Sequence, residues 1–385
     1  MVLALAGCSF EGRLVEGFEQ KRTDAPFYAS PTAPAEQAAP GSIVRADVID
    51  NPPSGSRGWR VVYHSTDLGG DDIQVSGVIV APTAPAPSGG RTVISWAHPT
   101  TGTAPRCGPS VGVDPFDDIE GLTDLLKRGY VVAATDYSGM GLPGPPSYLI
   151  GETEGRNVLD AARAARKLGA THSSSRVALW GHSQGGQAAL FAAQLATSYA
   201  PELAVQAVGV AAPAVDLAAL LTADIVDVSG VSIGAYAFAA YSEVYGPTTP
   251  GADLDEILTP AAAAAVPKMN ALCLLGQNAQ LHAIADPLVG AFLTADPATT
   301  EPWASLLAEN TPGAERISIP LYVAQGDTDT LVRPGLTDAF VGRQSGLGAD
   351  VTYEKIADTG HGLVALRALG TFLPWLEAHA PAVVP

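Results

Sequence analysis

Apolar and polar positions alternate in the first part of the chain. Three strand-like segments occur between Ile43 and Thr83, namely Val44–Ile49, Trp59–Ser65 and Ile73–Ala81. Short segments of this kind, joined by turn residues, are typical of neighbouring antiparallel strands. We therefore expect them to form the antiparallel edge of a mixed sheet.

Beyond this region, strand-like apolar runs alternate with helical patterns. Arg156–Leu168 carries Val158, Leu159, Ala162 and Ala165 on one face, and a second helix is expected at about Leu363–Ala378. Strands that alternate with helices indicate a parallel, doubly wound sheet. The expected strands are Thr92–Ala97, Val131–Thr135, Val177–Trp180, Ala204–Ala212, Ile319–Gly326 and Val351–Ala357.

One connection is much too long for a simple crossover. The strand that ends near Pro213 is followed by the next only near Ile319, whereas about a dozen residues suffice for a crossover. Apolar segments in between (Ile233–Tyr245, Leu272–Val289 and Trp303–Leu307) predict short helices. We expect a tether at 1–41, a core at 42–215 and 315–385, and a helical cap at 216–314.

Composition excludes several partners. The chain has 385 residues, of which 47% are hydrophobic and 16% charged, with a formal net charge of −18. A large core is therefore available, and nucleic acid is excluded as a partner because phosphate binding needs a basic patch. No apolar run reaches the length of about 18 residues expected of a membrane-spanning helix.

The strongest chemical motif is Gly181-His-Ser-Gln-Gly185. It follows the apolar run Val177–Trp180 and precedes an alanine-rich helical segment, Gly186–Ala200. Gly-x-Ser-x-Gly between a strand and a helix is typical of a nucleophile elbow, in which a sharp turn exposes the serine hydroxyl. Glycine is common in this chain, so the alternative is a glycine-rich turn of another α/β protein. Partners for Ser183 decide between the two.

The expected partners follow in the order acid, then histidine. Asp327 and Asp329 both come after the strand that ends at Gly326, and we favour Asp329 because the loop has room to turn back there. Asp327 is expected to cap the turn. His361, between glycines after the last strand, is expected to be the base that accepts the serine proton.

Two backbone N–H groups should stabilise the oxyanion. One is expected from Gln184 and the other from the loop after the strand Thr92–Ala97, where Pro99 has no N–H and Thr100 or Thr101 must donate. His98 is expected to brace this loop. The loop Asp136–Gly141 is expected to line the site, and Asp136 is disfavoured as the acid because it precedes the serine.

With these residues in place, the chain resembles the secretory lipase family of cap-bearing α/β-hydrolases. The resemblance runs from about Phe27 to the C-terminus. It is carried by Phe27-Tyr28, Ala97-His-Pro-Thr-Thr-Gly102, Thr135-Asp-Tyr-Ser-Gly-Met-Gly141, Tyr148-Leu-Ile-Gly151, Asp160-Ala-Ala-Arg-Ala-Ala-Arg166, Gly181-His-Ser-Gln-Gly-Gly186 and the Asp329 and His361 loops. It implies an α/β-hydrolase fold and carboxylic ester hydrolysis by Ser183, Asp329 and His361, under a helical cap. Pro99 departs from the expected His-Gly-Thr.

The resemblance implies ester or lipid substrates and a monomer, and the chemistry needs no cofactor or metal. A serine peptidase or amidase shares the same three side chains, and a non-catalytic surface lipoprotein could keep the fold. Aliphatic or aromatic polyesters are a further substrate class that an open apolar cleft would accept. The sequence leaves acyl length and alcohol preference open.

The cysteines indicate export and a disulfide. Leu5-Ala-Gly-Cys8 resembles a bacterial lipobox, although the apolar stretch before it is short and no positive segment precedes it. We therefore expect a truncated export signal and a secreted or cell-surface lipoprotein anchored through lipid on Cys8; the alternative is an ordinary apolar tail. Cys107 and Cys273 are expected to form a disulfide that joins cap to core, with two buried free thiols as the alternative.

Overall fold

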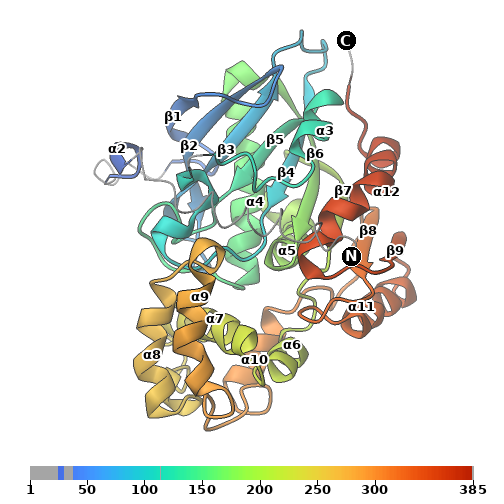
Figure 1. Cartoon of the computed structure of the whole chain (residues 1–385). Helices are drawn as coiled ribbons and strands as arrows, with labels where there is room; N and C mark the ends of the chain where they lie inside the picture. Colours follow the sequence, from blue (N-terminus) through green and yellow to red (C-terminus); the bar gives the residue numbers. More distant parts are fainter. Residues whose placement is uncertain (1–24, 30–37, 113, 384–385) are drawn as a thin grey trace, which may run out of the picture.

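The computed structural model describes residues 25–29, 38–112 and 114–383, and its centre is a nine-stranded sheet in the order β1-β2-β3-β5-β4-β6-β7-β8-β9 (Figure 1). The strands are β1 Ile43–Ile49, β2 Ser56–Thr66, β3 Asp72–Pro82, β4 Arg91–Ala97, β5 Val131–Thr135, β6 Ser173–His182, β7 Ala204–Ala211, β8 Leu321–Gly326 and β9 Val351–Ile356. The mostly parallel sheet expected from the alternating pattern, with an antiparallel edge, is confirmed.

The sheet is antiparallel at one side and parallel elsewhere. β1 pairs with β2, β2 with β3 and β3 with β5 in antiparallel fashion, and the pairs from β5 through β4, β6, β7 and β8 to β9 are all parallel. The carboxyl ends of the parallel strands therefore meet at one edge. Loops that follow these strands can bring distant side chains together there.

Helices cover both faces of the sheet. α4 Gly151–Lys167, α5 Gln184–Tyr199 and α11 Pro334–Gly346 share one hydrophobic core with one face, and α3 Leu122–Lys127 and α12 Val364–His379 share the other core with the opposite face. Coverage of both faces explains why every residue of β4 and β5 is buried, rather than every second one.

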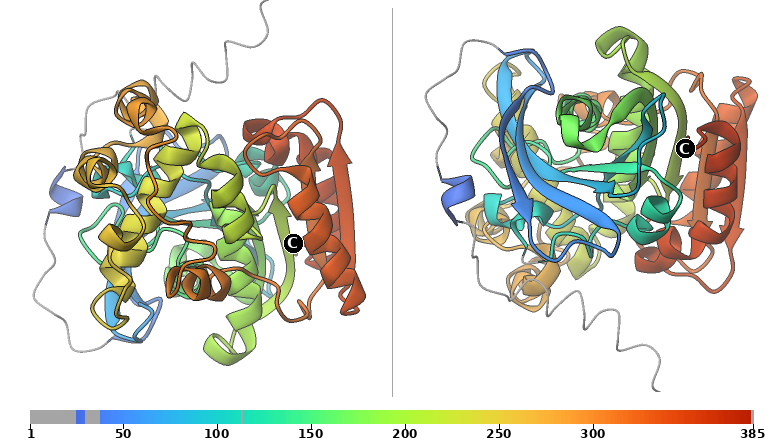
Figure 2. Two further views of the ribbon diagram at one scale, coloured as in Figure 1. Left: turned by 90° about the horizontal axis from the view of Figure 1, so that it is seen from below. Right: turned by 90° about the horizontal axis from the view of Figure 1, so that it is seen from above.

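The segment between β7 and β8 is helical and gathers at one end of the sheet (Figures 1 and 2). It contains α6 Leu217–Asp224, α7 Val228–Tyr245, α8 Pro260–Asn270, α9 Leu274–Ala285 and α10 Trp303–Glu309. Aromatic side chains hold it together: Phe238 makes an edge-to-face contact with Trp303 at 5.6 Å, and Tyr241 stacks on Trp303 at 6.4 Å. We call residues 216–314 the inserted segment.

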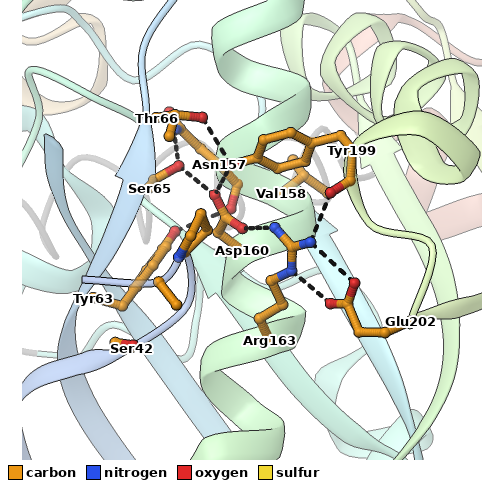
Figure 3. Close-up of polar contacts among 12 residues, drawn as sticks. Ser42, Tyr63, Ser65, Thr66, Asn157, Val158, Asp160, Arg163, Tyr199 and Glu202 are labelled. Atoms are coloured by element: carbon orange, nitrogen blue, oxygen red, sulfur yellow. Dashed lines mark hydrogen bonds and ion pairs between the residues drawn. The ribbon is translucent and has the colours of Figure 1, made fainter. Parts of the chain in front are cut away.

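A buried polar network anchors α4 between β2 and α5 (Figure 3). Asp160 accepts hydrogen bonds from Ser65 and Tyr199 at 2.7 Å, and Arg163 pairs with it at 2.8 Å. Arg163 also pairs with Glu202 at 2.7 Å. A buried carboxyl group is costly unless such partners satisfy it, so this network fixes the helix that precedes the elbow strand.

Cys107 and Cys273 form a disulfide, the pairing expected from the sequence, with their Cα atoms 5.3 Å apart. It links the loop after β4 to the start of α9. Cys8 and most of the expected tether lie outside the described residues. Within the described part of the chain, no helix has the length and apolar character needed to cross a bilayer.

Candidate active site

Ser183 lies at a sharp turn between β6 and α5. Its backbone has φ 58° and ψ −118°, a conformation that non-glycine residues rarely adopt. A side chain on Gly181 would bring its Cβ to 2.1 Å from the Gly185 carbonyl oxygen, and one on Gly185 would bring its Cβ to 1.9 Å from the Ala97 carbonyl oxygen. Both glycines are therefore required for the backbone to turn back over β4.

Three side chains from three loops meet at this turn. The Oγ of Ser183 lies 2.9 Å from Nε2 of His361, and Nδ1 of His361 lies 2.8 Å from Oδ2 of Asp329. Ser183 follows β6, Asp329 follows β8, and His361 begins the 3₁₀ turn η6 (His361–Leu363) after β9. The arrangement lets His361 take the hydroxyl proton while Asp329 holds the other ring nitrogen.

Asp329 is held by its own loop. It is 4% exposed, and Oδ1 accepts hydrogen bonds from the backbone N–H groups of Leu331 and Val332 at 2.9 Å each. Asp327, the competing carboxylate, is exposed, and its backbone N–H donates to Ile356. The loop thus presents Asp329, the favoured residue, to His361 and leaves Asp327 in solvent.

The loop after β4 lies beside the elbow. Gln184, Thr100 and Thr101 border the same cavity as Ser183. The hydroxyl of Thr101 donates to the Cys107 carbonyl, whereas the hydroxyl of Thr100 is within 2.8 Å of the Tyr148 hydroxyl at the cavity wall. The side chain of Thr101 is therefore committed to the loop, and that of Thr100 faces the cavity.

His98 is engaged with backbone carbonyls. Its ring nitrogens lie 2.6 Å from the Pro99 oxygen and 3.4 Å from the Asp136 oxygen, and its ring packs on Tyr137 at 4.5 Å. Burial lowers the pKa of His98. These contacts brace the loop, as expected.

The expectation that the Asp136–Gly141 loop lines the site is wrong. None of its residues borders the cavity. Asp136 points away from the elbow and accepts hydrogen bonds from the Ser76 hydroxyl at 2.5 Å and from the Ser110 backbone N–H at 2.8 Å. The loop instead contacts the 98–101 loop through Tyr137, whose hydroxyl donates to the His98 carbonyl at 3.1 Å.

A cavity of about 240 Å³ opens onto Ser183. Apolar side chains of the inserted segment form one wall, and the polar loops form the other. Two carboxyl groups that border the cavity have raised pKa values. Burial is the main cause of the rise in the pKa of Asp118 to about 7, and the neighbouring carboxyl groups of Asp117 and Glu120 add to it. Burial raises the pKa of Asp224 to about 7 against the opposing effect of Arg333. The apolar wall is formed by Leu217, Leu220, Leu221, Ile233, Leu274 and Leu275.

Comparison with known proteins decides the family. The sequence model of the family described as "Secretory lipase" matches residues 116–381, which is more than half of the chain. The chain belongs to the secretory lipase family. Among curated members, Lipase 4 of Candida albicans is 29% identical over 211 residues, which are 50% of this chain and 44% of that protein. Lipase A of Moesziomyces aphidis is 27% identical over 194 residues, 47% of this chain and 40% of that protein.

This member of the secretory lipase family therefore matches less than half the length of those relatives. Solved structures share its fold over most of the chain. Candida antarctica lipase A in its closed state has a TM-score of 0.73 at 18% identity, covering 90% of this chain and 83% of that one. The rice cell wall degrading esterase LipA from Xanthomonas oryzae has a TM-score of 0.73 at 19% identity, covering 89% of this chain and 98% of that one.

The sequence did not point to Glu154, which lies directly behind the elbow. Glu154 is fully buried on α4; Oε1 accepts hydrogen bonds from the Gln184 amide at 2.6 Å and the Leu149 backbone N–H at 3.2 Å. Burial raises the pKa of Glu154 well above 4.5, against the lowering effect of these bonds. This buried carboxyl group therefore holds the side chain of a candidate oxyanion donor.

Glu154→Gln is expected to stabilise the protein at pH 8 and to leave it nearly unchanged at pH 4. Because burial raises the pKa of Glu154 in the folded state, wild-type stability falls as pH rises above the unfolded value near 4.5. The glutamine cannot ionise, so the variant does not lose stability in this way. Its free energy of unfolding at pH 8 should exceed that of the wild type by on the order of 1 kcal/mol. Urea unfolding of both proteins at the two pH values measures it. An equal difference at both would contradict the raised pKa of Glu154.

Proposed function

We propose that this protein is a serine carboxylic ester hydrolase of the lipase or esterase type. Ser183 is the nucleophile, His361 the general base and then acid, and Asp329 the group that orients His361. One observation carries the proposal: the continuous hydrogen-bonded chain from Ser183 through His361 to Asp329, with spacings of 2.9 and 2.8 Å, opens onto an apolar cavity.

In this mechanism Ser183 attacks the ester carbonyl as His361 accepts its proton. The backbone N–H groups of Gln184 and Thr100 stabilise the oxyanion, and the alcohol leaves with the proton from His361. Water, activated by His361, then hydrolyses the acyl-enzyme. No metal or organic cofactor takes part in any step.

The inserted segment, 216–314, serves as the cap over the acyl group. Its leucines and Ile233 supply the apolar surface, and the cavity of about 240 Å³ lies just below the usual ligand-pocket range of roughly 300–1,000 Å³. The favoured substrates are therefore esters of short and medium acyl chains. Polyesters should be tested beside these esters because the ends of a polyester chain present short acyl groups of the same kind.

A series of p-nitrophenyl esters tests this substrate class. We expect kcat/KM to rise from acetate to about hexanoate, because each buried methylene contributes about 0.8 kcal/mol, and then to fall at least about tenfold towards palmitate, whose chain does not fit. Leu221→Ala should move the optimum to longer chains, whereas Leu347→Ala, an exposed control, should not. A palmitate optimum in the wild type would contradict the assignment.

Comparison of an ester with its matching anilide separates ester hydrolysis from peptidase or amidase activity. We expect the ester to react at least about 10³-fold faster, and comparable rates would favour an amidase. Reaction of Ser183 with a fluorophosphonate probe tests whether the fold is catalytic at all.

Export is part of the proposal. A disulfide between Cys107 and Cys273 is typical of proteins from oxidising compartments. Anchoring through lipid on Cys8, which lies outside the described residues, would place the enzyme at a bacterial cell surface as a monomer. Radiolabelled palmitate incorporation that is lost in Cys8→Ser tests this anchor.

A further inference from the structure

His182 is the last residue of β6 and directly precedes the nucleophile, and it is buried at 2% exposure. Its Nδ1 lies 3.2 and 3.1 Å from the two carboxylate oxygens of Glu120, and its Nε2 lies 3.1 Å from the backbone carbonyl oxygen of His361. The rings of His182 and His361 are 5.1 Å apart. His182 thus connects the acidic loop before α3 with the loop that carries the base.

These contacts determine where the protons are. A backbone carbonyl only accepts hydrogen bonds, so Nε2 of His182 must carry a proton. Nδ1 faces the carboxylate of Glu120, which also only accepts, so Nδ1 carries a proton as well. Burial by itself would lower the pKa of His182, but the charge and hydrogen bonds of Glu120 outweigh it and raise that pKa. These contacts and the raised pKa favour the imidazolium form of His182, paired with Glu120.

We propose that His182 and Glu120 form a positioning pair that holds the His361 loop against the elbow and keeps His361 able to accept a proton in mildly acidic solution. The positive end of the pair faces His361, and two imidazolium rings at this separation repel each other. This inference rests on the proposed function.

Other titratable groups surround the pair. Asp329, from the loop after β8, acts on His182 by its charge and is hydrogen-bonded to His361. Asp118 lies close enough to Glu120 for the two carboxyl groups to interact. Asp329 favours the protonated form of His182.

The test compares pH profiles of kcat/KM for p-nitrophenyl butyrate. His182→Gln keeps a donor for the His361 carbonyl but removes the positive charge and leaves the Glu120 side chain in place. We expect the acidic limb of its profile to move upward by about one pH unit. Glu120→Gln should move the limb in the same direction by less, because His182 then loses its charge together with its counter-ion.

The matched control is His64→Gln. His64 is also buried and pairs with a carboxylate, Asp72, at 2.9 Å, but it lies on β2 outside the residues that border the cavity. Its replacement should leave the acidic limb in place. A merely structural role of His182 would lower kcat/KM by the same factor at every pH, without moving the limb, and that result would overturn the proposal.

A second readout does not depend on turnover. Histidine ring NMR on Ser183→Ala, with and without His182→Gln, follows the titration of His361 directly, and the midpoint should be higher when His182 is absent. Identical His361 midpoints with and without His182→Gln would overturn the proposed role of the His182–Glu120 pair, even if the enzyme is active. Hydrolysis at the wild-type rate by Ser183→Ala would instead overturn the proposed function. If His182→Gln does not fold, Glu120→Gln gives the same comparison.

Discussion

Ser183→Ala is expected to lower kcat for p-nitrophenyl butyrate by about 10³-fold or more and to change KM little. The substitution removes the attacking oxygen, and the only catalysis left would come from the oxyanion donors and from binding. The smaller side chain fits the elbow because the strained backbone turn depends on Gly181 and Gly185 and not on the hydroxyl. The loss should therefore appear in a folded protein with unchanged thermal stability.

Ser198→Ala is a suitable control because Ser198 is an exposed serine on α5, the helix that begins at the elbow. It should retain wild-type kcat and label with a fluorophosphonate, whereas Ser183→Ala should not label. Retention of more than about a tenth of wild-type kcat by Ser183→Ala would rule out acyl-enzyme catalysis at this residue.

The sheet could be predicted because its two strand environments leave different patterns in the sequence. β1 to β3 have turn residues between them and pair as antiparallel neighbours, whereas β4 and β5 are buried throughout and read as apolar runs between helices. The start of α4 was predicted too late, at Arg156 rather than Gly151, because Gly151 and Gly155 weaken a helical pattern. In the structure a Cβ on Gly155 would lie 2.8 Å from the Ala192 nitrogen, so glycine is there for close packing of α4 on α5.

The three side chains at the elbow were accessible to sequence reasoning because chain order and strand ends restrict where each can lie. Glu154 and Glu120 were not, since their role depends on burial and on partners far away in the chain. Glu154 lies in the first turns of α4, before the predicted helix, and Glu120 belongs to an acidic loop that reads as solvent-exposed. Burial and the hydrogen bonds to Gln184 and His182 distinguish them from surface carboxylates.

The double substitution Cys107→Ser/Cys273→Ser is expected to lower the free energy of unfolding by several kcal/mol. The disulfide joins residues 166 positions apart, and the loss of loop-closure entropy in the unfolded chain predicts about 5 kcal/mol for a loop of that length. Urea unfolding under non-reducing conditions measures the change.

Activity should fall with stability in this variant because the disulfide lies between the oxyanion loop and the inserted segment. The Leu274 backbone N–H, next to Cys273, donates to the Thr101 carbonyl at 2.9 Å, and the Thr101 hydroxyl donates to the Cys107 carbonyl at 2.8 Å. Loosening the link therefore moves a cavity wall and a candidate oxyanion loop together, and KM should rise. Cys8→Ser controls for the loss of a cysteine. Two free thiols at 107 and 273 in denatured, unreduced wild-type protein would contradict the expected stability loss.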